Sequence, residues 1–210
     1  MIKTPKFWYY NNTSSSIIAL ALYPLSIIWI IISFVKKIFI KPHKSKLKVI
    51  CVGNLNIGGT GKTPFTIYIY KILKKLGYKP IFLTRGYKGL EKGPVKVKPD
   101  HNFKDVGDEA LLLSKVGPTI VSANRSLGAK FIEDLKDNYN VILMDDGLQN
   151  NKLEQDIKLL LIDKKLKFGN EFCFPSGPLR EPIKQGLKYI DAIVLTGNER
   201  KFINCNNKFN

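Results

Sequence analysis

The sequence predicts an α/β fold with a largely parallel sheet flanked by helices, preceded by an apolar N-terminal helix. Three observations predict this class. Short apolar runs alternate with amphipathic stretches over most of the 210 residues. A glycine-rich loop joins the first run to the first amphipathic stretch. Residues 17–35 form an uncharged stretch close to the roughly 20 residues that cross a bilayer core. We therefore expect an anchor segment with a basic flank at 1–47, one α/β domain at 48–200, and a loose tail at 201–210.

The apolar stretch at 17–35 predicts membrane attachment, either by spanning or by deep insertion. Lysines are concentrated after it, at positions 36, 37, 41, 44, 46 and 48, which predicts that the C-terminal part stays cytoplasmic. A cleaved signal peptide and a buried core helix are alternatives. An interfacial helix is a further alternative, because polar, aromatic and proline residues interrupt the stretch: Tyr23, Pro24, Ser26, Trp29 and Ser33.

The elements after the anchor follow in a regular order. An apolar stripe at i, i+3, i+4 and i+7 spacing predicts a helix from Phe65 to Leu76, with Gly77 as its C-cap. Further helices are expected at 108–116 and 127–136. The short β-branched run that opens residues 49–64 is expected to form a strand, and further strands are expected at 81–83, 119–122, 141–144, 157–162 and 192–195. In parallel sheets of this kind, ligands bind at the carboxyl ends of the strands.

Composition excludes several classes of protein. The net charge is +17, but 30 of the 34 basic residues are scattered lysines, so no nucleic acid partner is expected. Three widely spaced cysteines predict neither a disulfide framework nor a zinc site. Arg85, Arg125 and Arg180 each lie in a compact polar motif, where a rigid guanidinium can bind phosphate or carboxylate.

Residues 49–64, VICVGNLNIGGTGKTP, predict a phosphate-binding P-loop. Backbone N–H groups of the loop would surround a β-phosphate, Lys62 would reach the β and γ oxygens, and the Thr63 hydroxyl would bind Mg²⁺. The first glycine of the template is replaced by Asn56. An ordinary glycine-rich turn is the alternative. The predicted nucleotide-binding residues are Asn56, Ile57, Gly58, Gly59, Thr60, Gly61, Lys62 and Thr63.

Two adjacent carboxylates, Asp145 and Asp146, follow the apolar run at 141–144. This pattern is typical of a Walker B element, and the predicted metal ligands are Thr63, Asp145 and Asp146. A solvated turn is the alternative. Asp108, at the start of a predicted helix, is interpreted equally well as an N-cap or as a general base.

Two further motifs contain Arg85 and Arg180. Thr84-Arg85-Gly86-Tyr87 follows a predicted strand, and residues 175–182 form a proline-bracketed loop that contains Arg180 and Glu181. Such a loop can hold a substrate phosphate, or its Arg–Glu pair can form a structural salt bridge.

These motifs together resemble one family. VGNLNIGGTGKTP, TRGY, VGDEALLL, DDGLQ, FGN and PSGPLREP occur in this order after a Trp-bearing N-terminus and a Tyr-Pro-Leu-Ser segment. The sequence resembles the tetraacyldisaccharide 4'-kinases, membrane-bound lipid A kinases of Gram-negative bacteria. The resemblance implies a P-loop NTPase-like kinase domain at the cytoplasmic face of the inner membrane. It would transfer the γ-phosphate of ATP to the 4'-hydroxyl of a tetraacylated glucosamine disaccharide 1-phosphate in the bilayer.

The resemblance also implies roles for residues. The Gly58–Thr63 loop would bind ATP, Asp146 with Thr63 would hold Mg²⁺, and Asp108 with Lys62 would act in catalysis. Second members of the site would be Asp145, Arg85, Arg125, Arg180 and Glu181. Asn150 stands where the family usually has histidine, and family members are longer, with a distal histidine that pairs with the catalytic aspartate. We therefore expect a chain that lacks the family's C-terminal part.

These departures leave two alternatives to an active kinase. One is a catalytically impaired, membrane-tethered remnant that still binds nucleotide or lipid. The other is a membrane-associated GTPase, although the sequence has no N-K-x-D motif that would read guanine.

Overall fold

The computed structural model describes residues 4–9, 13–58, 61–197 and 201–204. The chain divides into two compact units, each built from separated segments. Unit 1 comprises Met1–Ile40, Asn54–Thr60 and Leu159–Asn210, and unit 2 comprises Lys41–Gly53 and Gly61–Lys158. The expected boundaries were different, because the sequence placed the anchor in a segment of its own. In the structure the apolar N-terminal segment belongs to the same compact unit as the C-terminal residues.

Unit 2 contains the predicted parallel sheet. Its strands are β1 (Lys48–Gly53), β2 (Pro80–Thr84), β3 (Val95–Lys96), β4 (Thr119–Val121) and β5 (Val141–Asp145). They lie in the order β3-β4-β2-β5-β1, and all neighbours are parallel except β3 and β4. Every residue of β2, β4 and β5 is buried, which is the pattern of strands covered on both faces. The predicted fold class is confirmed.

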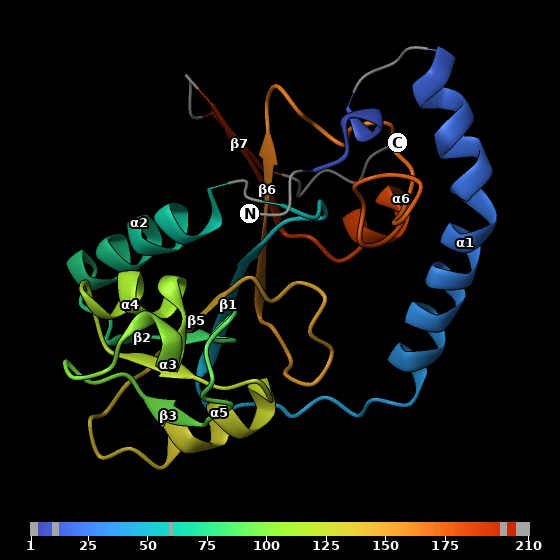
Figure 1. Cartoon of the computed structure of the whole chain (residues 1–210). Helices are drawn as coiled ribbons and strands as arrows, with labels where there is room; N and C mark the ends of the chain where they lie inside the picture. Colours follow the sequence, from blue (N-terminus) through green and yellow to red (C-terminus); the bar gives the residue numbers. More distant parts are fainter. Residues whose placement is uncertain (1–3, 10–12, 59–60, 198–200, 205–210) are drawn as a thin grey trace. The chain divides into compact units, whose positions relative to one another are not determined.

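The helices of unit 2 cover both faces of this sheet: α2 (Lys62–Lys75), α3 (Phe103–Val106), α4 (Asp108–Ser114) and α5 (Arg125–Glu133) (Figure 1). Phe82 packs with Tyr70 of α2 and Leu113 of α4. The next residue, Leu83, faces α5, where a Cβ added to Gly128 would lie 2.6 Å from Leu83 Cδ1. Consecutive strand residues point to opposite faces, so α2 and α4 lie on one face and α5 on the other. Glycine at position 128 permits this close approach of α5.

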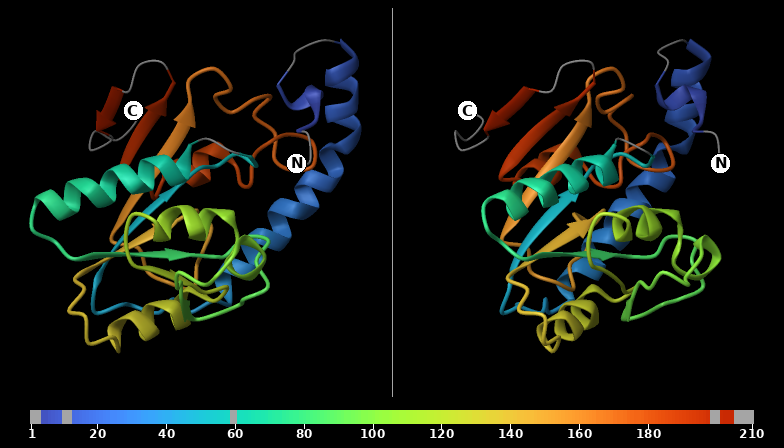
Figure 2. Two further views of the ribbon diagram at one scale, coloured as in Figure 1. Left: turned by 60° about the vertical axis from the view of Figure 1, so that its left-hand side comes forward. Right: turned by 90° about the vertical axis from the view of Figure 1, so that its left-hand side faces the viewer.

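Unit 1 contains η1 (Lys6–Trp8), α1 (Thr13–Ile38), α6 (Ile183–Leu187), β7 (Ala192–Thr196) and β8 (Lys201–Asn204). It also holds β6 (Ile157–Asp163) from Leu159 onward. β7 pairs in parallel with β6 and antiparallel with β8, and Figure 2 shows these orange to red strands side by side. The tail was expected to be loose from residue 201; its first four residues instead form β8, because the free edge of β7 offers backbone partners. The rest of that expectation lies outside the described residues.

Candidate functional site

The predicted site residues of unit 2 gather where β1, β2, β4 and β5 end. We call this region the carboxyl edge; it comprises residues 61–66, 85–87, 107–109, 122–125 and 145–147. β1 and β5 are adjacent and in register, with Val52 opposite Asp145. Because both strands run in the same direction, the segments that follow them leave the sheet side by side. The start of α2 and the two aspartates are thereby brought together.

Gly61 sets the direction in which α2 begins. It is the N-cap of α2 and has a left-handed φ of 75°, a conformation that glycine adopts without strain. Lys62 and Thr63 form the first turn, and both are buried. Proline at position 64 is tolerated there because the first turn has no intrahelical partner for its missing N–H. The first turn of α2 therefore points its N–H groups at the carboxyl edge, an arrangement that favours bound phosphate.

Asp145 is fixed by two hydroxyl groups of α2. It is 1% exposed, and its carboxylate accepts hydrogen bonds from Thr63 Oγ1 at 2.9 Å and from Thr66 Oγ1 at 2.8 Å. Burial raises the pKa of Asp145 to about 6; the two threonine hydrogen bonds oppose this rise, and the charges of Glu109 and Asp146 add to it. Burial therefore disfavours the ionised form of this carboxylate. A cation at this place would favour that form.

Asp146 takes a different direction from Asp145. It has a left-handed φ of 50°, and its N–H donates to Val52 O at 3.0 Å. Its Oδ2 lies 3.6 Å from Lys62 Nζ, and the side chain is partly exposed. Thr63 bonds to Asp145, and Asp146 faces the lysine. That Thr63 and Asp146 together hold Mg²⁺ stays a prediction. The turn at Asp146 gives the two adjacent carboxylates different partners, although the charge of Asp146 still raises the pKa of Asp145.

Thr63, Asp145 and Asp146 offer the hydroxyl and carboxylate oxygens that Mg²⁺ prefers. In the part of the chain that the structure describes, no group of three or more His, Cys, Asp and Glu side chains could hold a metal ion. Mg²⁺ at a nucleotide site takes few protein ligands and completes its shell with phosphate oxygens and water. The residues present therefore fit Mg²⁺ bound together with a nucleotide.

Arg125 brings a buried positive charge to the same edge. It is the first residue of α5 and 2% exposed, and Nη1 donates to Ser122 O at 2.6 Å. Its Nε has no hydrogen-bond partner in the described structure. Burial lowers the pKa of Arg125 to about 10; the nearby Cys51 thiol and the two aspartates oppose this, and the exposed Arg85 reinforces it. Arg85 and Arg125 follow β2 and β4, two adjacent parallel strands, so both belong to the carboxyl edge.

Asp108 and Glu109 begin α4, and glycines hold their backbone against the loop after β2. A Cβ added to Gly107 would lie 2.3 Å from Tyr87 O, and Gly107 has a φ of 85°. A Cβ added to Gly86 would lie 3.1 Å from Val106 O. The TRGY and GDE motifs are therefore in direct contact. The side chain of Asp108 is exposed at the start of α4.

The other predicted site residues lie in unit 1. Asn56 to Gly58 belong there, and Gly59 and Thr60 lie outside the described residues. Ile57 N–H donates to Pro178 O at 2.7 Å, and Arg180 N–H donates to Leu55 O at 2.8 Å. Asn56 also forms an antiparallel bridge with Leu179 and donates from Nδ2 to Lys167 O at 2.8 Å. The first half of the glycine-rich loop is thus bonded to the loop that carries Arg180.

Glu181 has structural partners. Its carboxylate accepts hydrogen bonds from Lys37 Nζ of α1, at 2.8 Å, and from the Tyr189 hydroxyl. The side chain is 5% exposed. The sequence offered an Arg180–Glu181 pair or a substrate ligand as the two interpretations of this residue. The structure gives Glu181 a salt bridge with a lysine 144 positions away.

Sequence reasoning missed three residues that belong to this architecture. Thr66 bonds to Asp145, and its spacing of three from Thr63 on a predicted helix places both hydroxyls on one face. Glu109 was named only as part of a motif, yet its charge acts on Asp145. Gln155, buried, donates to Gly147 O at 2.8 Å and to Asn150 O at 3.2 Å, which braces the turn after the aspartates. No local pattern marks Gln155, because its role depends on a turn eight residues earlier.

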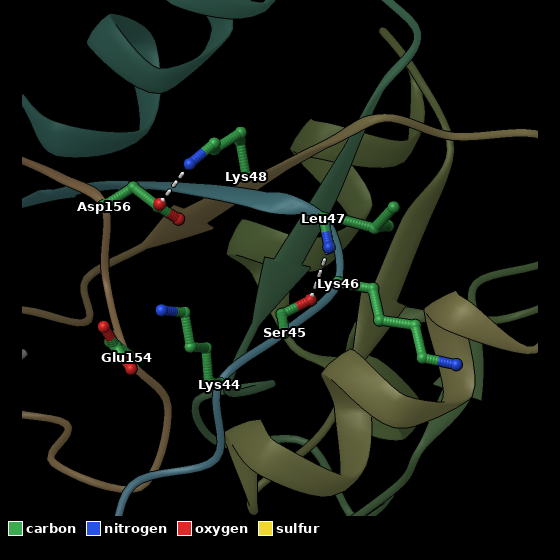
Figure 3. A pocket seen from close by; sticks show the side chains of 7 residues that line it. All are labelled: Lys44, Ser45, Lys46, Leu47, Lys48, Glu154 and Asp156. Atoms are coloured by element: carbon green, nitrogen blue, oxygen red, sulfur yellow. Dashed lines mark hydrogen bonds and ion pairs between the residues drawn. The ribbon is translucent and has the colours of Figure 1, made fainter.

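A hollow of about 190 Å³ lies elsewhere in unit 2, and Figure 3 shows its lining by Lys44 to Lys48, Glu154 and Asp156. Lys48 Nζ bonds to Asp156 Oδ1 at 2.8 Å across it. Because Lys48 is the first residue of β1, this hollow lies at the opposite end of the strand from the carboxyl edge. None of the predicted site residues lines it.

Comparisons with known proteins show which family this chain belongs to. The model of the family described as tetraacyldisaccharide-1-P 4'-kinase matches residues 18–209. A tetraacyldisaccharide 4'-kinase of Paramagnetospirillum magneticum is 41% identical over 203 residues, which cover 95% of this chain and 60% of that protein. Its counterpart in Rickettsia bellii is 38% identical over 194 residues, which cover 92% of this chain and 59% of the other.

A solved structure shares the fold. LpxK from Aquifex aeolicus, crystallised in complex with ATP, superposes with a TM-score of 0.74 at 34% identity. The match covers 85% of this chain and 58% of that one. The chain therefore spans about three fifths of the length of the relatives it matches.

Proposed function

Because this chain belongs to the tetraacyldisaccharide-1-P 4'-kinase family, we propose that it transfers the γ-phosphate of ATP to the 4'-hydroxyl of a tetraacylated disaccharide 1-phosphate. The observation that carries the proposal is the junction of Thr63 with Asp145 at the N-terminus of α2. It joins a phosphate-binding helix end to a buried carboxylate, the pair of groups that P-loop phosphoryl-transfer enzymes use to hold Mg²⁺.

The residues of the carboxyl edge have different roles in the proposed reaction. Lys62 and the N–H groups of the first turn of α2 bind the β- and γ-phosphates. Thr63 and Asp145, with Asp146 beside them, would hold Mg²⁺, which would neutralise phosphate charge. Asp108 accepts the proton of the sugar hydroxyl, because it is exposed and begins a helix that the glycine contacts fix in place. Arg125 and Arg85 stabilise the negative charge of the transferred group.

The acceptor lipid gives the N-terminal helix its purpose. The segment Ser16–Ile38 is long and apolar enough to cross a membrane. Only 11% of its most apolar 18-residue stretch is buried. Ser26, at mid-helix, is hydrogen-bonded to Cys173 O of an irregular loop. A spanning helix would carry that loop to the bilayer centre, where unpaired backbone is strongly unfavourable. We therefore propose that α1 lies within one leaflet of the inner membrane, on the cytoplasmic side, with its lysine-rich end at the anionic headgroups.

The kinase proposal is tested with the full chain in detergent micelles containing the disaccharide 1-phosphate, Mg²⁺ and γ-labelled ATP. We expect labelled lipid from the wild type, at least about a hundredfold less from Asp108→Asn and Lys62→Ala, and normal yields from Asp100→Asn and Lys71→Ala. The controls remove equivalent charges from exposed positions. Nucleotide binding without labelled lipid would identify the chain as a binding remnant and refute the kinase proposal.

The leaflet proposal has its own test. In sealed inner-membrane vesicles of known orientation, a membrane-impermeant reagent is applied to single cysteines placed near residue 5 and near residue 100. An interfacial helix leaves both on the same side, whereas a spanning helix separates them. Labelling from opposite sides would refute the proposal.

A further inference from the structure

The face of α1 that contacts the rest of unit 1 is a narrow stripe. Its more buried positions recur every three or four residues, as expected for one face of a helix. They are Ala19, Leu22, Ser26, Ile30, Ser33 and Lys37. Large apolar side chains on the remaining faces are exposed, including Ile28, Ile31 and Phe34. The contact face is therefore the most polar face of an apolar helix, which is the reverse of a helix that packs on a soluble core.

Ser26, at the middle of this stripe, bonds to the backbone of the loop that carries Arg180. Ser26 Oγ donates to Cys173 O at 2.8 Å and accepts from Ser176 N–H at 3.1 Å. Ser176 Oγ donates in turn to Ala19 O. Ser26 and Ser176 are 1% and 0% exposed. Buried backbone groups without a partner are costly, so these bonds hold the loop in one conformation.

Two tryptophans extend the same contact. Trp29 Nε1 donates to Arg180 O at 3.1 Å, and Trp8 Nε1 donates to Pro175 O at 3.1 Å. Both rings pack edge-on against Phe174, with centroids 5.2 and 6.3 Å away. Each indole thus donates a hydrogen bond to one carbonyl of the loop and packs against the ring of Phe174.

Lys37 completes the contact at the C-terminal end of α1. Its Nζ lies 2.8 Å from Glu181 Oε2 and 5.5 Å from the centroid of the Tyr189 ring. Glu181 directly follows Arg180, and its carboxylate is nearly inaccessible to solvent. A buried carboxylate that loses its cation is strongly destabilised, so the lysine fixes the position of the residue beside Arg180.

We propose that α1 is a brace for the Arg180 loop as well as a membrane attachment, and that Ser26, Trp29 and Lys37 are positioning residues for the acceptor lipid. This inference rests on the proposed kinase function. The loop is itself bonded to the first half of the glycine-rich loop, through Ile57 and Leu55. The brace therefore holds the backbone of Arg180 beside the first half of the glycine-rich loop.

The test compares matched variants of the full chain in vesicles. Lys37→Met is compared with Lys36→Met, since each removes one positive charge from the same helix end. Trp29→Phe, which removes only the donor and keeps an aromatic ring, is compared with Phe34→Leu on an exposed face. Ser26→Ala is compared with Ser33→Ala on the same stripe. Readouts are amide hydrogen exchange over residues 173–181, the KM values for lipid and for ATP, and vesicle binding.

We expect about tenfold faster exchange and at least about fivefold higher KM for the lipid in Lys37→Met, Trp29→Phe and Ser26→Ala. The KM for ATP and vesicle binding should match the paired control. Lys37→Arg should restore both exchange and lipid KM, because it keeps the ion pair.

Equal rates of amide hydrogen exchange over residues 173–181 in Lys37→Met and Lys36→Met would overturn the proposal that α1 braces the loop. Faster exchange with an unchanged lipid KM would overturn the positioning role. If the wild type transfers no phosphate, the kinase proposal fails by itself, and the exchange data still decide whether α1 braces the loop.

Discussion

Thr63 Oγ1 donates a 2.9 Å hydrogen bond to Asp145 Oδ2, and this bond ties the first turn of α2 to the end of β5. The two residues are 82 positions apart. They meet because β1 and β5 are adjacent parallel strands in register, so the segments that follow them emerge at one edge. The bond also keeps the hydroxyl and the carboxylate together where Mg²⁺ and phosphate are proposed to bind.

Thr63→Val should weaken binding of Mg²⁺-ATP by about tenfold, because valine keeps the shape of threonine but removes the hydroxyl ligand. Thr63→Ser should bind nearly as well as the wild type. Titration calorimetry of the full chain with Mg²⁺-ATP measures both. Wild-type affinity in Thr63→Val would remove Thr63 from the proposed metal site.

Asp145 should make the nucleotide-free protein less stable as the pH rises. Burial raises its pKa to about 6, above the ordinary value of 3.8, so the folded state binds the proton more tightly than the unfolded state. The contribution of Asp145 to the free energy of unfolding therefore falls between about pH 4 and about pH 6. Above this range the contribution stays at its unfavourable value. The Asp145→Asn variant should not show this trend.

Urea unfolding at several pH values, without Mg²⁺ or nucleotide, measures the free energy of unfolding of the Asp145→Asn variant and of the wild type. We expect the variant to gain stability relative to the wild type as the pH rises from about 4 to about 7. A constant difference would show that the carboxylate titrates alike in both states.

Glu133 should have the opposite pH dependence. Although burial raises its pKa, hydrogen bonds from Ser45 Oγ, Lys46 N–H and His43 outweigh burial and lower the pKa below 4.5. Glu133 then contributes stability above the unfolded pKa, and this contribution is lost as the pH falls through the folded value. Glu133→Gln should cost about 1 kcal/mol at about pH 7.

The cost of Glu133→Gln should disappear on acidification to about pH 3. Thermal unfolding across this range measures it, with Glu154→Gln as the control on an exposed side chain. If Glu133→Gln still lowered the stability of the protein at about pH 3, packing rather than charge would hold residues 43–46 against α5.

Gly107→Ala should destabilise the protein much more than Gly77→Ala, although both glycines have a φ of 85°. At Gly77 a Cβ meets nothing within 4 Å, so the change costs only the left-handed conformation, about 1 kcal/mol. At Gly107 the Cβ would lie 2.3 Å from Tyr87 O, which adds about 1–3 kcal/mol. Denaturant unfolding measures both variants. Equal costs would show that the loops at Asp108 can separate freely.

Much of unit 2 could be predicted because its signals are local. Alternation of apolar runs with helical stripes placed β2, β4, β5, α2, α4 and α5 close to their observed bounds. The short elements β3, α3 and α6 have too few residues to show a period, so the sequence did not reveal them. The glycine-rich loop was recognisable as a motif, but its division between two units was not.

The sequence by itself determined the parallel α/β fold, the apolar helix and the identity of the candidate site residues, because hydrophobic period and motif spacing are properties of neighbouring positions. Only the tertiary structure decided which partners those residues have. Thr63 bonds to Asp145 rather than Asp146, and Glu181 pairs with Lys37. Each choice depends on side-chain directions set by strand register and helix packing over 82 and 144 positions, which no local pattern contains.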